Sequence, residues 1–106
     1  MSKYMRIIVF FDLPVVTKKD RKIYTQFRRF LIKDGYDMLQ FSVYSRICNG
    51  DDGAKKHYIR LKENLPKKGS IRYMKVTEKQ YAAMEILVGK KTIRERKISA
   101  DQLSIF

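Results

Sequence analysis

An unbroken run of five apolar residues, Ile7–Phe11, is the feature that most constrains the fold. A short continuous run that is rich in β-branched and aromatic residues is typical of a strand buried inside a sheet. The run stops at Asp12, and a turn at Leu13-Pro14 follows it. The sequence therefore predicts a buried strand with a single carboxylate, that of Asp12, at the edge where the strand leaves the sheet.

The net charge of the chain limits the classes of function that it can have. In 106 residues there are 24 Lys and Arg but only 11 Asp and Glu, which gives a formal charge of +13. The length is that of one domain, and an apolar fraction of 44% indicates a folded protein and not a basic disordered tail. A folded domain this basic most often binds nucleic acid. The alternative is a generally basic surface that only keeps the protein soluble.

Several classes of protein are disfavoured. Cys48 is the only cysteine, so an internal disulfide and a cysteine-rich zinc site are excluded. No stretch approaches the ~18 apolar residues that a membrane-spanning helix needs. The first apolar run ends at Asp12 without the small-residue cleavage site of a signal peptide. We therefore expect a cytoplasmic protein with no membrane partner.

A basic amphipathic helix is predicted over residues 17–34, with Thr17 as the N-cap and Gly35 just beyond the end. Its apolar residues recur at helical spacing: Ile23, Phe27, Phe30 and Leu31. The same range carries seven Lys and Arg and two Asp, a net charge of +5. Cations spaced along a helix match consecutive phosphates and do not read base sequence. A merely solvated helix face is the alternative.

The remaining elements alternate between strand and helix. The pattern predicts, in order, one long strand or two strands with a kink near Phe41-Ser42 over 36–47, a loop over 49–53, a helix over 54–65, a strand over 70–76, a short helix opened by the capping box Thr77–Gln80, a strand over 84–88, a basic linker over 89–98 and a last strand over 102–106. This order fits an α+β domain with the helices on one face of the sheet.

Asp12 is the candidate metal ligand and catalytic residue. Mg²⁺ needs about six oxygens and usually takes one or two of them from carboxylates. A single Asp12 is a poor site, but two copies facing each other across a two-fold axis would make a better one. The alternative is structural, with the Asp12 carboxylate capping the turn before Pro14.

The other titratable residues have structural interpretations. Asp34 and Asp37 flank Gly35 and are expected to form a turn, and Asp51 and Asp52 are expected to cap a helix. The only histidine, His57, falls among lysines and arginines on an otherwise polar helix face. With no serine, cysteine or second histidine in a motif beside it, no catalytic role is expected for it.

Five short motifs resemble one family across essentially the whole chain. They are FDLP at 11–14, FRRFL at 27–31, QFSVYS at 40–45, PKKG at 66–69 and VTEKQ at 76–80. Each is weak alone, but their order and spacing are similar to those of the small CRISPR-associated adaptation proteins, the Cas2 family, in the branch found at type II loci.

The resemblance implies a ferredoxin-like β-α-β-β-α-β sandwich over residues 1–88 and a homodimer. Residues 89–106 would then be a basic linker and an extra C-terminal strand, or a tail, used in contacts with the other subunit or a partner. The leading hypothesis is a bridge and ruler subunit that works with the Cas1 integrase in spacer acquisition and binds double-stranded protospacer DNA without sequence preference. The residues expected to bind DNA are Lys18, Lys19, Arg21, Lys22, Arg28, Arg29, Lys67 and Lys68.

The alternative implied by the same resemblance is a Mg²⁺-dependent endonuclease acting on single-stranded RNA or double-stranded DNA. Asp12 from both subunits would then hold the metal at the dimer interface and serve as the catalytic residue. Beyond Asp12, no acidic residue has a spacing that obviously builds a metal site, so the sequence leaves open whether the protein is an enzyme.

Overall fold

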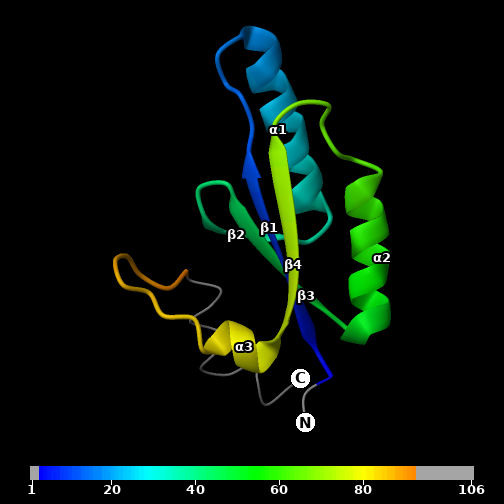
Figure 1. The fold of residues 1–106 in the computed structure, drawn as a ribbon, viewed down its shortest axis with the longest axis vertical. Helices are drawn as coiled ribbons and strands as arrows, with labels where there is room; N and C mark the ends of the chain where they lie inside the picture. Colours follow the sequence, from blue (N-terminus) through cyan, green and yellow to red (C-terminus); the bar gives the residue numbers. More distant parts are fainter. Residues whose placement is uncertain (1–2, 93–106) are drawn as a thin grey trace.

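The structure, a computed structural model, describes residues 3–92 and contains one antiparallel sheet with helices (Figure 1). Along the chain, the elements are β1 (Met5–Asp12), α1 (Lys18–Lys33), β2 (Asp37–Gln40), β3 (Val43–Cys48), α2 (Gly50–Lys62), β4 (Ser70–Thr77) and α3 (Glu78–Ala82). The strands lie in the order β2-β3-β1-β4. The expected α+β fold with β-α-β-β-α-β order is confirmed.

The central strand β1 is buried because it pairs with β3 on one side and β4 on the other. Its alternate residues Ile7 and Val9 have no exposed surface, and they pack in one core with residues of α1 and α2. Both helices therefore cover the same face of the sheet, as predicted. In the described part of the chain, no helix is long and apolar enough to cross a membrane.

Helix α1 follows its predicted boundaries closely. Thr17 is the N-cap, and its hydroxyl accepts a hydrogen bond from the Asp20 backbone N–H at 3.0 Å. The Asp20 carboxylate accepts in return from the Thr17 backbone N–H, which completes a capping box. Phe27 and Leu31 are the buried residues of the helix. Local sequence determined these limits because caps and helical spacing act within a few residues.

The segment 36–47 forms two strands, which was one of the two alternatives. β2 and β3 are joined at Phe41-Ser42, and Ser42 has a φ of +65°. Only a few per cent of non-glycine residues adopt this left-handed conformation. The backbone N–H of Phe11 donates to the carbonyl of Ser42 at 3.0 Å, so the turn is held against the end of β1.

Both predicted boundaries of α2 are wrong. α2 begins at Gly50 and ends at Lys62, so the predicted loop over 49–53 is mostly its first turn and the helix does not reach residue 65. Asp51 and Asp52 lie inside that first turn instead of capping the helix. Their negative charges there interact favourably with the helix dipole and stabilise the helix. Residues that favour turns in general are compatible with a first helical turn.

Residues 84–88 form no strand in the described chain. This segment instead borders a cavity against Ile8 and Phe10, on the sheet face that the helices leave open. Apolar contact with a sheet face does not require strand pairing, so an apolar run alone was not enough to predict a strand. The predicted strand over 102–106 lies outside the described residues.

Gly69 fits closely against the end of β1. Its φ is +93°, and a Cβ atom built on it would lie 2.5 Å from Leu13 Cδ2 and 2.7 Å from the Asp12 carbonyl oxygen. We therefore expect Gly69→Ala to lower the free energy of unfolding by about 1–3 kcal/mol, because both the backbone strain and the clash oppose the native loop. Urea denaturation measures this loss.

The matched control for this substitution is Gly53→Ala in α2. A Cβ atom at Gly53 would meet its nearest neighbour at 3.6 Å, an ordinary contact, and alanine favours a helix. Gly53→Ala should therefore be neutral or stabilising. Equal stability of the Gly69→Ala variant and the wild type would show that the close packing against Leu13 and Asp12 does not limit this loop.

Candidate nucleic-acid interface and Asp12 cleft

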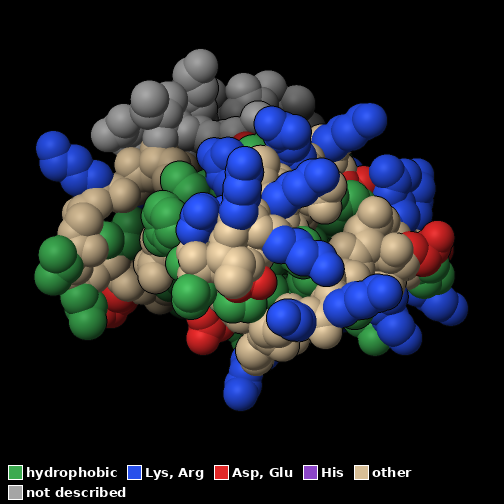
Figure 2. Space-filling view, turned by 90° about the horizontal axis from the view of Figure 1, so that it is seen from above, with side chains coloured by type: hydrophobic (Ala, Val, Ile, Leu, Met, Phe, Trp, Pro, Cys, Tyr) green, Lys and Arg blue, Asp and Glu red, His purple; other side chains and the backbone are tan. Residues whose placement is uncertain are grey.

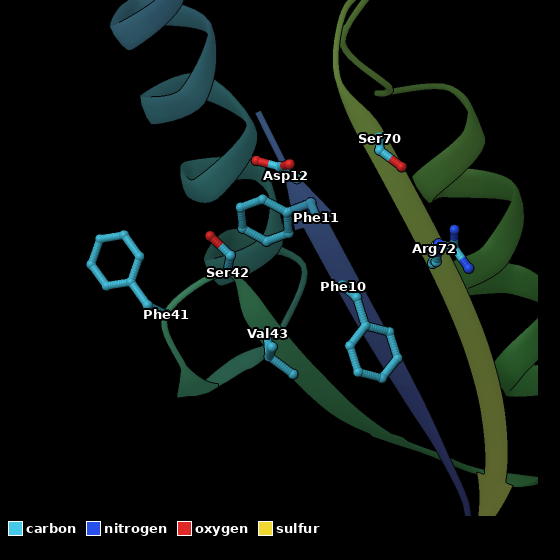
Figure 3. Close-up of a pocket in the computed structure, with 8 residues that line it drawn as sticks. All are labelled: Phe10, Phe11, Asp12, Phe41, Ser42, Val43, Ser70 and Arg72. Atoms are coloured by element: carbon cyan, nitrogen blue, oxygen red, sulfur yellow. The ribbon is translucent and has the colours of Figure 1, made fainter. Parts of the chain in front are cut away.

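A cleft of about 240 Å³ lies at the end of β1 where Asp12 emerges (Figure 3). Strands β1, β3 and β4 and the β2–β3 turn contribute the residues that line it: Phe10, Phe11, Asp12, Phe41, Ser42, Val43, Ser70 and Arg72. Segments far apart in the sequence therefore converge on the one carboxylate that the sequence singled out.

The register between β1 and β4 explains this convergence. Asp12 pairs directly with Ser70, and Phe10 pairs with Arg72. Directly opposed residues of antiparallel strands project from the same sheet face. Asp12, Ser70 and Arg72 therefore share the face that α1 and α2 do not cover.

The Asp12 carboxylate is exposed, and no group among residues 3–92 forms a hydrogen bond or an ion pair with it. The structural alternative, in which Asp12 caps the turn before Pro14, is therefore not seen. With no partner in the described part of the chain, this carboxylate is a candidate to bind a ligand.

The oxygen donors of the cleft fit one class of metal. Within residues 3–92, no group of three or more His, Cys, Asp or Glu residues could hold an ion without help. The cleft instead offers the Asp12 carboxylate with the hydroxyls of Ser42 and Ser70. Mg²⁺ commonly binds one or two carboxylates and completes its shell with water and substrate phosphate. The residues fit a metal that is shared with substrate, and Arg72 adds a planar cation suited to phosphate.

The basic side chains predicted to bind nucleic acid are all exposed: Lys18, Lys19, Arg21, Lys22, Arg28, Arg29, Lys67 and Lys68. Lys68, in the loop before β4, lies beside Asp20 in the first turn of α1. Figure 2 looks onto this end of the molecule and shows Lys and Arg side chains spread widely across it. In the folded protein, the basic loop before β4 therefore lies next to the basic first turn of α1.

The acidic residue Asp20 lies within this basic surface. The hydrogen bond from the Thr17 backbone N–H is the main cause that holds the pKa of Asp20 below its usual value of 3.8. Asp20 therefore carries its negative charge at neutral pH and offsets one nearby cation.

The basic residues of α1 are not equally free to bind phosphate. Arg21 donates to the carbonyls of Val15 and Val16 at 3.3 and 3.0 Å, and Arg28 donates from Nε to the Tyr44 hydroxyl at 2.9 Å. Lys18, Lys19, Lys22 and Arg29 have no such partner within residues 3–92. This second set is therefore the better candidate for contacts with nucleic acid.

The structure corrects the predicted surroundings of His57 and Asp34. His57 is 8% exposed and lies in the buried stripe of α2, and Asp34 is 6% exposed. The Asp34 carboxylate is 3.0 Å from His57 Nδ1 and 2.8 Å from Arg60 Nε. These contacts tie the end of α1 to α2. The spacing Ala54, His57, Leu61 was the signal that His57 faces inward.

Sequence reasoning missed the residues that surround Asp12 in the cleft, above all Phe41, Ser42 and Arg72. The alternation of the 70–76 strand does predict that Arg72 lies on the face opposite Ile71 and Tyr73. No sequence feature indicated that this strand pairs with β1 in the register that sets Ser70 against Asp12.

Comparison with known proteins agrees with the fold. Residues 5–84 match the family described as "CRISPR associated protein Cas2". The chain is 60% identical over 102 residues to the CRISPR-associated endoribonuclease Cas2 of Acidovorax ebreus, an alignment that covers 96% of this chain and 100% of that relative. It is 45% identical over 100 residues to the protein of the same name from Flavobacterium psychrophilum, with 94% and 86% covered.

A solved structure titled "Crystal structure of cas2" superposes with a TM-score of 0.57 over 85% of this chain and 92% of that chain. The two sequences are 17% identical, so the superposition supports the fold alone.

Proposed function

The chain belongs to the family of CRISPR-associated Cas2 proteins, and from this premise we propose that it is an endoribonuclease that cleaves the RNA backbone at the Asp12 cleft. The observation that carries the proposal is the exposed Asp12 carboxylate, which has no partner within residues 3–92 and lies in a cleft that also contains Arg72. Two relatives, 60% and 45% identical to the chain, bear the name endoribonuclease. Of the two hypotheses from the sequence, these names favour the endonuclease over the DNA-binding ruler.

The proposed active unit is a homodimer that brings two Asp12 carboxylates together. One carboxylate per subunit matches the small number that Mg²⁺ takes from protein. When bound, Mg²⁺ would stabilise negative charge on the phosphate and lower the pKa of a bound water. Asp12 would hold the metal, and Arg72 would bind and orient the phosphate beside it.

Cleavage of end-labelled single-stranded RNA tests this proposal. The purified protein is incubated with the RNA in Mg²⁺ and, separately, in EDTA, with double-stranded DNA as a second substrate. We expect RNA fragments with Mg²⁺ and intact RNA with EDTA, from a protein that elutes as a dimer. Intact RNA under both conditions, from a folded dimer, would reject the endoribonuclease.

A second function is favoured by the exposed cations of α1, which do not line the cleft. In this candidate the dimer acts in the cytoplasm as the bridge of a spacer-acquisition complex, holding protospacer DNA for a Cas1 integrase, with residues 89–106 contacting the partner. Co-purification with the integrase, followed by sizing with and without a short duplex, tests the assembly. Failure to form any complex with the integrase would remove this candidate.

Salt dependence tests the α1 surface directly. We expect the triple variant Lys18→Ala, Lys22→Ala, Arg29→Ala to bind duplex DNA more weakly. If each side chain contacts one phosphate, the slope of log affinity against log salt should become less steep by about 2.7, or roughly 0.9 for each contact. Fluorescence anisotropy at several salt concentrations measures both quantities.

The matched control removes three cations from α2: Lys55→Ala, Lys56→Ala and Lys62→Ala. All three side chains are exposed, and the loss of net charge is identical. An equal effect of the two triple variants would mean that total charge, and not the α1 surface, determines binding.

A further inference from the structure

We propose that Phe41 is the base-stacking residue of the Asp12 cleft and holds a nucleobase next to the phosphodiester that is cleaved. This inference rests on the proposed function, since it assigns a specificity residue to that same site. Phe41 lines the cleft together with Asp12 (Figure 3), and it projects from the β2–β3 turn.

The exposure of Phe41 is the first observation that supports this role. Its side chain is 80% exposed, although a phenylalanine normally gains stability by burial. One neighbouring ring supports it: the centroids of Phe41 and Tyr24 are 6.4 Å apart with an interplanar angle of 25°. Tyr24 belongs to α1 and is half-buried. Tyr24 of α1 therefore packs against one side of the Phe41 ring, and most of the ring surface is left open to a ligand.

The backbone beside Phe41 is the second, independent observation. Ser42 adopts a φ of +65°, a strained conformation for a residue with a side chain, and such strain is concentrated at functional sites. The Ser42 carbonyl accepts from the Phe11 N–H at 3.0 Å, and the Ser42 and Tyr24 hydroxyls lie 3.4 Å apart. These contacts set the position of Phe41 relative to Asp12, which directly follows Phe11.

A nucleotide has chemical groups that match both the charged part of the cleft and the Phe41 ring. Each nucleotide has a charged phosphate and a flat base, and proteins that bind single strands stack successive bases on aromatic side chains. Stacking tolerates every base because each has a π-face. With the phosphate bound by Arg72 beside Asp12, the neighbouring base would meet the exposed Phe41 ring. A base inside a duplex stack could not make this contact, so the cleft should favour unpaired nucleotides.

The test measures stacking separately from cleavage. The protein carries Asp12→Asn, so that it binds RNA without cleaving it. It is mixed with a series of single-stranded RNAs that differ only in the position of one fluorescent base, 2-aminopurine. The change in 2-aminopurine fluorescence on binding is recorded for each RNA. We expect strong quenching at one or two adjacent positions, lost with Phe41→Ala and restored with Phe41→Trp. With Asp12 intact, Phe41→Ala should raise KM by roughly 5- to 100-fold with kcat nearly unchanged, as expected for a stacking contact made equally before and during reaction.

Ile59→Ala is the matched control, since Ile59 is an exposed apolar residue of α2, 47% exposed, that does not line the cleft. It should change neither quenching nor KM. If the wild type cleaves RNA and Phe41→Ala leaves quenching and KM unchanged, or alters only dimer dissociation, base stacking by Phe41 is rejected while the nuclease stands. If the wild type fails to cleave but quenching still depends on Phe41, the nuclease is rejected and the stacking assignment stands.

Discussion

An Asp12→Asn variant is expected to lose RNA cleavage by a factor on the order of 100 to 1,000, the range seen when one group that stabilises transition-state charge is removed. Asparagine has nearly the same shape as aspartate, but it is neutral and a weaker ligand for Mg²⁺. Because Asp12 is exposed and has no partner among residues 3–92, the free energy of unfolding should change by no more than about 0.5 kcal/mol. Loss of activity without loss of stability would assign a chemical role to the carboxylate.

The measurement compares initial rates of RNA cleavage at saturating Mg²⁺, with urea denaturation and sizing of the same preparations. Asp52→Asn is the matched control, because Asp52 is an exposed carboxylate in the first turn of α2 and does not line the cleft. Cleavage by Asp12→Asn at the rate of Asp52→Asn would remove Asp12 from the active site. A cleavage-deficient variant that still supports the acquisition of new spacers would identify DNA scaffolding as the main task.

A Glu78→Ala variant is expected to lower the free energy of unfolding by about 3–5 kcal/mol, the usual effect of breaking a buried ion pair by removing one partner. Arg6 Nε lies 2.5 Å from Glu78 Oε1, and the two side chains are 5% and 12% exposed. A guanidinium stays charged in proteins, so Arg6 would remain buried without its counter-ion. The Tyr81 ring, 4.0 Å from the guanidinium carbon, would offset part of this loss.

Urea denaturation measures the effect, with two comparisons. Asp51→Ala breaks the exposed pair between Lys75 Nζ and Asp51 Oδ1, in which the side chains are 40% and 77% exposed. This substitution should lower the free energy of unfolding by less than about 1 kcal/mol. The double variant Arg6→Met, Glu78→Leu should recover most of the stability that Glu78→Ala loses, because apolar side chains often replace a buried pair well. A loss with Glu78→Ala no larger than with Asp51→Ala would show that α3 does not depend on this pair.

Local interactions explain which features could be predicted. The continuous apolar run identified β1, and Thr17, Gly35 and helical spacing identified α1, because these signals act within a few residues. The capping box at Thr77 identified the start of α3 for the same reason. The predicted strand over 84–88 and the predicted start of α2 at residue 54 were wrong, since an apolar run or a cluster of turn residues is compatible with more than one structure until packing selects among them.

The residues of the candidate site also fall into those that the sequence identified and those that it did not. Asp12 was recognised from its place at the end of a buried strand, and the basic residues of α1 from their spacing. Their roles in metal and nucleic-acid binding stay predictions. The inward position of His57 was not recognised, although its spacing from Ala54 and Leu61 indicated it. The cleft residues Phe41 and Arg72 were not recognised, since their place beside Asp12 depends on segments distant in sequence.

By itself, the sequence determined the family, the α+β class, the central strand ending in Asp12 and a strong positive charge. Only the tertiary structure decided what surrounds Asp12: Ser70 and Arg72 through the β1–β4 register, and Phe41 through the turn hydrogen-bonded to Phe11. The physical reason is that caps and periodicity depend on residues close in the chain. Strand register depends on how the whole hydrophobic core packs, which no short stretch of sequence encodes.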